Sequence, residues 1–213
     1  MHYGVFEGQN AKDQPARYLI LGESHHISTD HNVTTDKIAG VPASYTTASV
    51  IQEHLDKRKI HEFLTKIAKT FGAVEEEVFW QSVYFGNYID VLCGIGNSIA
   101  QNQIKNNGNR IKYNDQLFQF VNEHKIEKIF CFSILTYKNL PSLCNDEESL
   151  WDTVGMRGNR RVFLRQCKYN AGTHHEGTSV LLQHDLRVYG ISHPQAKCGY
   201  SPELYAAVLK NKL

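Results

Sequence analysis

The segment Tyr18-Leu19-Ile20-Leu21-Gly22-Glu23-Ser24-His25 carries the clearest fold signal in the sequence. Its run of apolar residues ends at a glycine, which is typical of a strand buried on both faces of a sheet. After this strand, Thr46 to Phe71 have the apolar spacing of a helix. Gly72 follows and is expected to end the helix. Further strands are predicted over residues 83–85, 128–133 and 186–191. Alternating strands and helices favour parallel pairing, so we expect an α/β fold: a three-layer α/β/α sandwich around a mainly parallel four-stranded sheet.

The rest of the chain is interpreted as connections within a single domain of residues 1–213. A chain of 213 residues, of which 41% are hydrophobic, is long enough to bury a core. Residues 1–16 are polar and are expected to form a surface arm. Asn114 is expected to cap the N-terminus of the helix that follows it. Long loops are expected over residues 23–45, 94–113 and 139–160.

Charge and cysteine content exclude several classes of protein. The net charge of +1 excludes an overall basic coat for nucleic acid, so any contact with DNA must come from a local patch. The five cysteines are widely spaced and contain no C-x-x-C, which disfavours a disulfide framework, a zinc ribbon and an iron–sulfur site. The chain shows neither an apolar run of about 20 residues nor a secretory signal. We expect a cytoplasmic monomer that does not bind membranes.

Polar residues follow each of the four predicted strands. Gly22-Glu23-Ser24-His25 follows the first, Asn87 the second, residues 133–138 the third and Ser192-His193-Pro194-Gln195 the fourth. Because ligands of parallel α/β sheets bind at the carboxyl ends of the strands, these clusters are expected to converge on one edge.

Each cluster has a chemical interpretation and a structural one. Glu23, with Ser24 and His25, can hold a water and act in acid–base chemistry, or the segment is only a polar turn. His193 is held extended by Pro194 and can donate a hydrogen bond to an oxygen that gains charge, or it is a surface histidine. The Asn87 amide can bind one edge of a base while an aromatic such as Phe85 stacks on it, although most aromatics there are expected in the core.

Basic residues and paired histidines offer further candidates. Adjacent histidines such as His25-His26 and His174-His175 suggest a metal, but neighbours on a strand point apart, and no helical metal motif accompanies them. The second candidate is a basic stretch that can follow phosphates or be a solvated face, formed by Arg157, Arg160, Arg161, Arg165 and Lys168.

These motifs, in this order, resemble those of the uracil-DNA glycosylase superfamily. The family's first motif, Gly-x-Asp-Pro or Gly-Glu-Ala-Pro, is here Gly22-Glu23-Ser24-His25, and its last, His-Pro-Ser, is His193-Pro194-Gln195. The family's Asn at the end of a middle strand corresponds to Asn87, and residues 130–141 are similar to its third-strand region. The resemblance spans about residues 16–205.

The resemblance implies a parallel α/β/α fold and a monofunctional DNA glycosylase that needs no cofactor. It implies that Glu23, with Ser24 or His25, orients the attacking water, that His193 polarises the leaving base, and that Gly22, Phe85 and Asn87 bind the base. It also implies that DNA is contacted by Lys138, Ser192, Pro194, Gln195 and Lys197.

The motifs also depart from the family pattern. His25 replaces the family's Pro, Ser24 occupies the position of its acid, and Gln195 replaces its Ser. The departures imply a divergent branch that acts on a uracil-like or modified base in DNA repair or antiphage defence. Two alternatives stay open: a metal- or haem-binding hydrolase that uses Gly-Glu-x-His, and an inactive protein that binds modified DNA.

Overall fold

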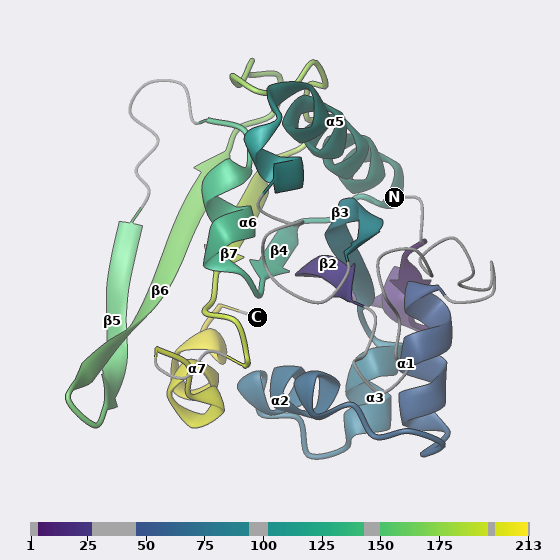
Figure 1. The fold of residues 1–213 in the computed structure, drawn as a ribbon, viewed down its shortest axis with the longest axis vertical. Coiled ribbons are helices and arrows are strands. Elements are labelled where there is room, and N and C mark those ends of the chain that lie inside the picture. Colours follow the sequence, from purple (N-terminus) through teal and green to yellow (C-terminus); the bar gives the residue numbers. More distant parts are fainter. Residues whose placement is uncertain (1–3, 27–45, 94–101, 143–149, 196–198, 213) are drawn as a thin grey trace.

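The computed structural model describes residues 4–26, 46–93, 102–142, 150–195 and 199–212 (Figure 1). Its strands form one sheet in the order β1-β3-β2-β4-β7-β6-β5. The strands predicted from the sequence are the four neighbouring parallel ones, so the α/β class and the parallel pairing are confirmed. They are β2 (Tyr18–His26), β3 (Tyr84–Cys93), β4 (Lys128–Cys131) and β7 (Leu186–Gly190).

The expectation of a four-stranded sheet is wrong, because antiparallel strands extend the sheet to seven. At one end, β5 (Leu150–Arg157) and β6 (Arg160–Tyr169) form a hairpin that pairs with β7. Residues 150–157, expected to lie in a loop, thus form the strand β5. In β6 the buried Val162 and Leu164 alternate with the more exposed Arg161, Phe163 and Arg165, and the two charged side chains obscure the strand pattern.

The surface-arm expectation for residues 1–16 is also wrong for the part that the structure describes. Strand β1 (Phe6–Glu7) pairs antiparallel with β3, and a short 3-10 helix, η1 (Ala11–Asp13), follows it. Phe6 and Ala11 are buried. Two apolar side chains spaced five residues apart give no periodic pattern, so sequence analysis does not detect such a segment.

Helices cover both faces of the sheet (Figure 1). Leu19 and Leu21 of β2 pack in the core beneath one helical layer, and Ile20 packs in the core beneath the other. None of the described helices is long and apolar enough to cross a membrane. The first layer consists of α5 (Asn107–His124) and α6 (Ile134–Asn139), and the second of α1 (Thr47–Leu55), α2 (Glu62–Thr70), α3 (Glu76–Gln81) and α7 (Pro202–Leu209).

Two expected helix boundaries are corrected. The helical pattern over 46–71 covers two helices, α1 and α2, which are separated near Lys57 by a left-handed backbone (φ 57°). Asn114 does not cap a helix. It is buried within α5, where its amide donates to the carbonyl of Gly177 (2.9 Å), and the cap is Asn106. Asparagine is common both at caps and in buried hydrogen-bond networks, so the residue type alone does not place the helix start.

Candidate functional site

The carboxyl ends of the four parallel strands bring together the residues singled out in the sequence. Gly22 and Glu23 lie on β2, and Asn87 lies on the neighbouring β3, in register with Gly22. His193 lies three residues beyond the end of β7. The predicted convergence thus places residues from distant parts of the chain at one edge of the sheet.

Asn87 lies directly over Gly22. A Cβ atom at Gly22 would overlap Oδ1 of Asn87 and would lie 3.4 Å from Cζ of Phe85. Phe85 and Asn87 are two residues apart on β3, so their side chains share one face of the sheet. Phe85 is buried and Asn87 is partly exposed. The absence of a side chain at Gly22 therefore lets an amide and an aromatic ring gather at the strand end.

Glu23 is oriented by a serine that follows β4. The Ser133 hydroxyl donates to Oε2 of Glu23 (2.6 Å) and accepts from the backbone N–H of Thr136 (3.1 Å) as the N-cap of α6. With its acceptor and donor both engaged, the buried Ser133 hydroxyl holds one carboxylate oxygen in place. Ser133 is a polar residue at the end of a predicted strand, like the predicted site residues, and this position is the signal that could identify it from the sequence.

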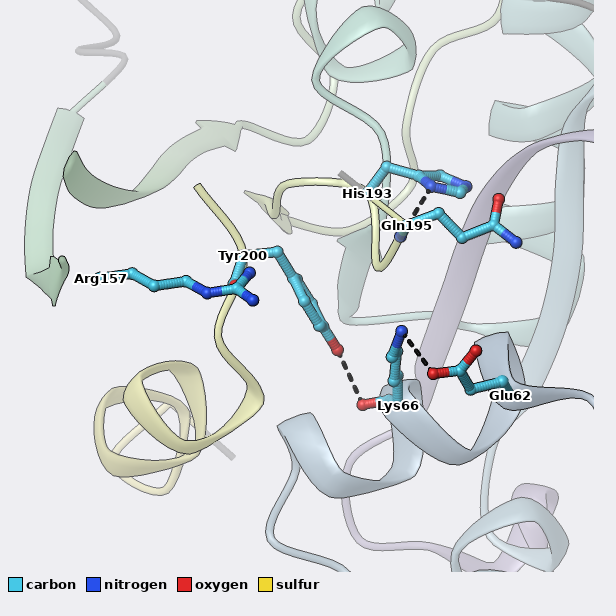
Figure 2. Close-up of polar contacts among 6 residues, drawn as sticks. All are labelled: Glu62, Lys66, Arg157, His193, Gln195 and Tyr200. Carbon is cyan, nitrogen blue, oxygen red and sulfur yellow. Dashed lines mark hydrogen bonds and ion pairs between the residues drawn. The ribbon is translucent and has the colours of Figure 1, made fainter. Parts of the chain in front are cut away.

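The His193 imidazole is held by a hydrogen bond and by a stacked ring. Its Nδ1 accepts from the backbone N–H of Gln195 (3.2 Å), as Figure 2 shows. In a neutral imidazole the proton is then on Nε2, which becomes the donor. The ring stacks on Phe63 of α2 (centroids 5.2 Å apart, planes at 28°), and Phe63 meets Phe85 edge to face at 6.5 Å. These contacts link His193 to the side of the sheet that carries Asn87.

The position of Phe63 at the site is not evident from the sequence, because its helical spacing places it with the core residues. The residue is only partly buried, and its ring lies between His193 and Phe85. Helical spacing identifies the face of α2 that packs on the sheet. It does not show that Phe63, near the start of this face, contacts His193 beyond the carboxyl end of β7.

The His193 loop, which connects β7 to α7, has both of its ends hydrogen-bonded to Tyr205 of α7. The fully buried Tyr205 hydroxyl accepts from the backbone N–H of Ser192 (3.2 Å). It shares its hydrogen between the carbonyls of Phe163 (2.8 Å) and Gly199 (3.3 Å). Burial raises the pKa of Tyr205, so the hydroxyl keeps this hydrogen at neutral pH. One phenol thereby holds both ends of the loop.

The remaining predicted site residues have varied surroundings. Ser24 is buried, whereas Lys138 is exposed near the end of α6. On the His193 loop, Pro194 is buried and Gln195 is exposed. The side chain of His25 and the whole of Lys197 lie outside the described residues.

The basic stretch is partly engaged within the protein. Arg157 donates to the carbonyl of Tyr200 (2.6 Å), and Lys168 pairs with Asp185 (2.6 Å). Burial lowers the pKa of Arg165, whereas Arg161 is exposed, and the side chain of Arg160 lies outside the described part. Among the residues that the structure describes, no group of three or more His, Cys, Asp or Glu side chains could hold a metal ion.

Two cavities lie elsewhere on the described surface. One of about 560 Å³ is bordered by Tyr18, Phe71 and Phe79, and another of about 390 Å³ by Tyr84 and Phe120. Gly22, Glu23, Asn87 and His193 line neither cavity.

Replacing Gly22 with alanine is expected to displace the Asn87 amide, because the new methyl group would overlap its oxygen. If Asn87 binds the substrate base, the change should raise the KM for base release about tenfold or more. This is the effect expected from the loss of one or two hydrogen bonds between uncharged groups. Steady-state kinetics measure this effect. Gly108→Ala is the control, because a methyl group there would lie at an ordinary contact distance of 3.4 Å from Oδ1 of Asn106. An unchanged KM in Gly22→Ala would contradict a role for the Asn87 position.

The cluster thus combines an amide, an oriented carboxylate, an imidazole donor and aromatic rings at one sheet edge. This set of groups suits a planar ligand with polar edges and a reaction in which a leaving group gains negative charge. The chain matches no protein-family model, and no curated protein is significantly similar to it in sequence.

Proposed function

We propose that the protein is a DNA glycosylase that hydrolyses the N-glycosidic bond of a uracil-like or modified base flipped out of DNA. One observation carries the proposal: the Asn87 amide lies over Gly22 at the strand end, with His193 attached to the same edge through Phe63 and Phe85. Glu23 follows Gly22 on β2, and its carboxylate is held by Ser133. The order of these residues along the chain resembles that of the uracil-DNA glycosylase motifs.

In this proposal the base leaves the DNA stack before the reaction. Flipping a nucleotide costs a few kcal/mol and presents the polar edge of the base to the protein. The Asn87 side chain offers one donor and one acceptor to that edge. The partly exposed Phe63 ring, which packs against the buried Phe85, supplies the apolar surface on which the base rests.

The bond breaks as negative charge gathers on the base and positive charge on the sugar. His193 donates from Nε2 to the base oxygen, because Gln195 already occupies Nδ1. Glu23, held by Ser133, orients the attacking water and balances the positive sugar. A general base of this kind contributes about 10²–10⁴-fold to a rate.

In this proposal the DNA backbone is bound around this edge by Lys138, Ser192, Gln195 and Lys197, whereas Pro194, which is buried, does not contact it. The exposed Lys138 and Gln195 come from two different strand ends, α6 after β4 and the loop after β7. The proposal includes a monomer that acts in the cytoplasm, in repair or in antiphage defence.

The proposal is tested by a base-release screen on single- and double-stranded oligonucleotides. The oligonucleotides carry uracil, hypoxanthine, hydroxymethylcytosine or glucosylated cytosine, and alkali-induced strand cleavage reports abasic sites. Cleavage at one of these bases supports the proposal. DNA binding without base release would favour an inactive binder of modified DNA. A bound metal or a haem absorbance band, with hydrolysis of other substrates, would favour the Gly-Glu-x-His hydrolase.

DNA affinity is expected to fall steeply between about 50 and 200 mM salt, because phosphate contacts release counterions. Lys138→Ala should reduce the slope of log Kd against log salt by about 1, the value for one phosphate contact. Fluorescence anisotropy at several salt concentrations measures the slope. Lys12→Ala serves as the control, since Lys12 pairs with Glu7 of β1 (2.8 Å), which lies opposite Tyr84 at the start of β3 rather than at its carboxyl end. Binding that does not depend on salt would remove DNA as the partner.

A further inference from the structure

Tyr200 attaches the His193 loop to helix α2. Its hydroxyl donates to the backbone carbonyl of Lys66 on α2 (2.8 Å; Figure 2). The same hydroxyl lies 2.6 Å from Oγ1 of Thr70, which is also on α2. Tyr200 and Thr70 are buried. Burial raises the pKa of Tyr200 to about 12, so the phenol remains a hydrogen-bond donor at neutral pH.

The loop therefore meets α2 at two points. His193 stacks on Phe63 near one end of the loop, and Tyr200 bonds Lys66 just beyond the other. Phe63 and Lys66 are three residues apart, so they occupy neighbouring positions about one turn apart on the same helix. Because α2 is a rigid element packed on the sheet, fixing the loop at Lys66 also fixes its register against Phe63.

A third contact secures the same segment from the opposite side. Arg157, at the end of β5, donates to the backbone carbonyl of Tyr200 (2.6 Å). Figure 2 shows Tyr200 between Arg157 and the Lys66 carbonyl. Tyr200 is thus held through its backbone by the β5–β6 hairpin and through its hydroxyl by α2.

We propose that Tyr200 is a positioning residue that fixes the His193 imidazole against Phe63 by attaching the loop to α2. The kinetic consequence of this proposal rests on the proposed function, whereas its structural consequence does not. Catalytic donors act only when they are held in the productive geometry, and a displacement of about 1 Å can cost about 10²-fold in rate.

The variant Tyr200→Phe tests the proposal without leaving a buried carbonyl unpaired. Thr70 Oγ1 also donates to the Lys66 carbonyl (2.9 Å), so this acceptor keeps a partner when the phenol is removed. Tyr169→Phe is the matched control. Tyr169 is also a buried tyrosine that donates to a backbone carbonyl, that of Pro141 (2.8 Å), and it packs in the core on the other face of the sheet.

The first measurement is the NMR spectrum of the His193 ring, assigned by comparison with His193→Ala. In the wild type the ring protons should be shifted upfield by the Phe63 ring, and the ring nitrogens should report a proton on Nε2. Tyr200→Phe is expected to move the ring protons toward the values of a free histidine, and Tyr169→Phe is not. An unchanged His193 spectrum in folded Tyr200→Phe would overturn the proposal, whatever the activity of the protein.

The second measurement is a double-mutant cycle on single-turnover base release. Tyr200→Phe should slow the wild type about 10- to 100-fold, the scale of a misplaced catalytic group. It should have little effect when His193 is already alanine, because the two residues act through the same group. An equal slowing in both backgrounds would show a general structural role and contradict the proposal. If the wild type releases no base, the proposed function fails, and the NMR result alone decides the role of Tyr200.

Discussion

Replacing His193 with alanine is expected to slow single-turnover base release by about 10²–10³-fold, the usual effect of deleting one preorganised donor. The hydrogen bond from Nε2 is strongest when the leaving base becomes anionic, so its loss raises the barrier rather than the dissociation constant. DNA affinity should change little, because phosphate contacts dominate binding. Quenched-flow or manual-quench assays with enzyme in excess measure the rate.

A second histidine provides the control for this variant. His184 is also partly buried, and its Nε2 lies 2.8 Å from the carbonyl of Ile126. Both residues precede strands, β7 and β4, so they lie away from the carboxyl ends that carry the site. His184→Ala should retain the wild-type rate. The melting temperature of His193→Ala should stay within a few degrees of the wild type, because a loop residue that is only partly buried contributes little to stability. Full activity in folded His193→Ala would remove the proposed role of the imidazole.

Replacing Glu23 with glutamine is expected to reduce base release by about 10²–10⁴-fold, the range for loss of a general base. The amide keeps the size of the side chain, and its carbonyl oxygen can still accept from the Ser133 hydroxyl. The negative charge, which would activate water and balance the sugar cation, is lost. The same single-turnover assay measures this effect, and circular dichroism confirms that the fold is retained.

Glu203→Gln is a closely matched control for Glu23→Gln. Glu203 also accepts from the hydroxyl of a helix-capping serine, Ser201 of α7 (2.8 Å), and its side chain is exposed. This variant removes the same charge from the same kind of hydrogen bond away from β2. If both variants were equally active, Glu23 would have no specific part in the reaction.

The sequence was sufficient to predict the centre of the fold. Leu19 to Leu21 are apolar at successive positions, as is typical of a strand with helices on both faces, and the structure buries all three in this way. The convergence of Gly22 and Asn87 on one edge is expected from the same pattern, because parallel strands end at the same edge. Their direct contact depends on the register of β2 against β3, which only the structure shows.

Other features depend on tertiary contacts that local sequence does not encode. The β5–β6 hairpin is rich in arginine, and one of these, Arg157, bonds the backbone of a residue 43 positions away along the chain. The break between α1 and α2 lies within one continuous apolar pattern. No glycine marks it, since the left-handed backbone there belongs to Lys57. Tyr200 looks like an ordinary core tyrosine in the sequence, and its role depends on a carbonyl of α2, 134 positions earlier.

The most direct test of the proposed glycosylase is the intact mass of a DNA strand after incubation with excess wild-type protein, measured before any alkali is added. The strand should contain a single copy of the base that the base-release screen identifies as the substrate. We predict that the strand loses this base and gains a hydroxyl group, that the free base appears in an equal amount, and that Glu23→Gln leaves the strand unchanged over the same time. A strand of unaltered mass that is nevertheless bound by the wild-type protein would contradict the account.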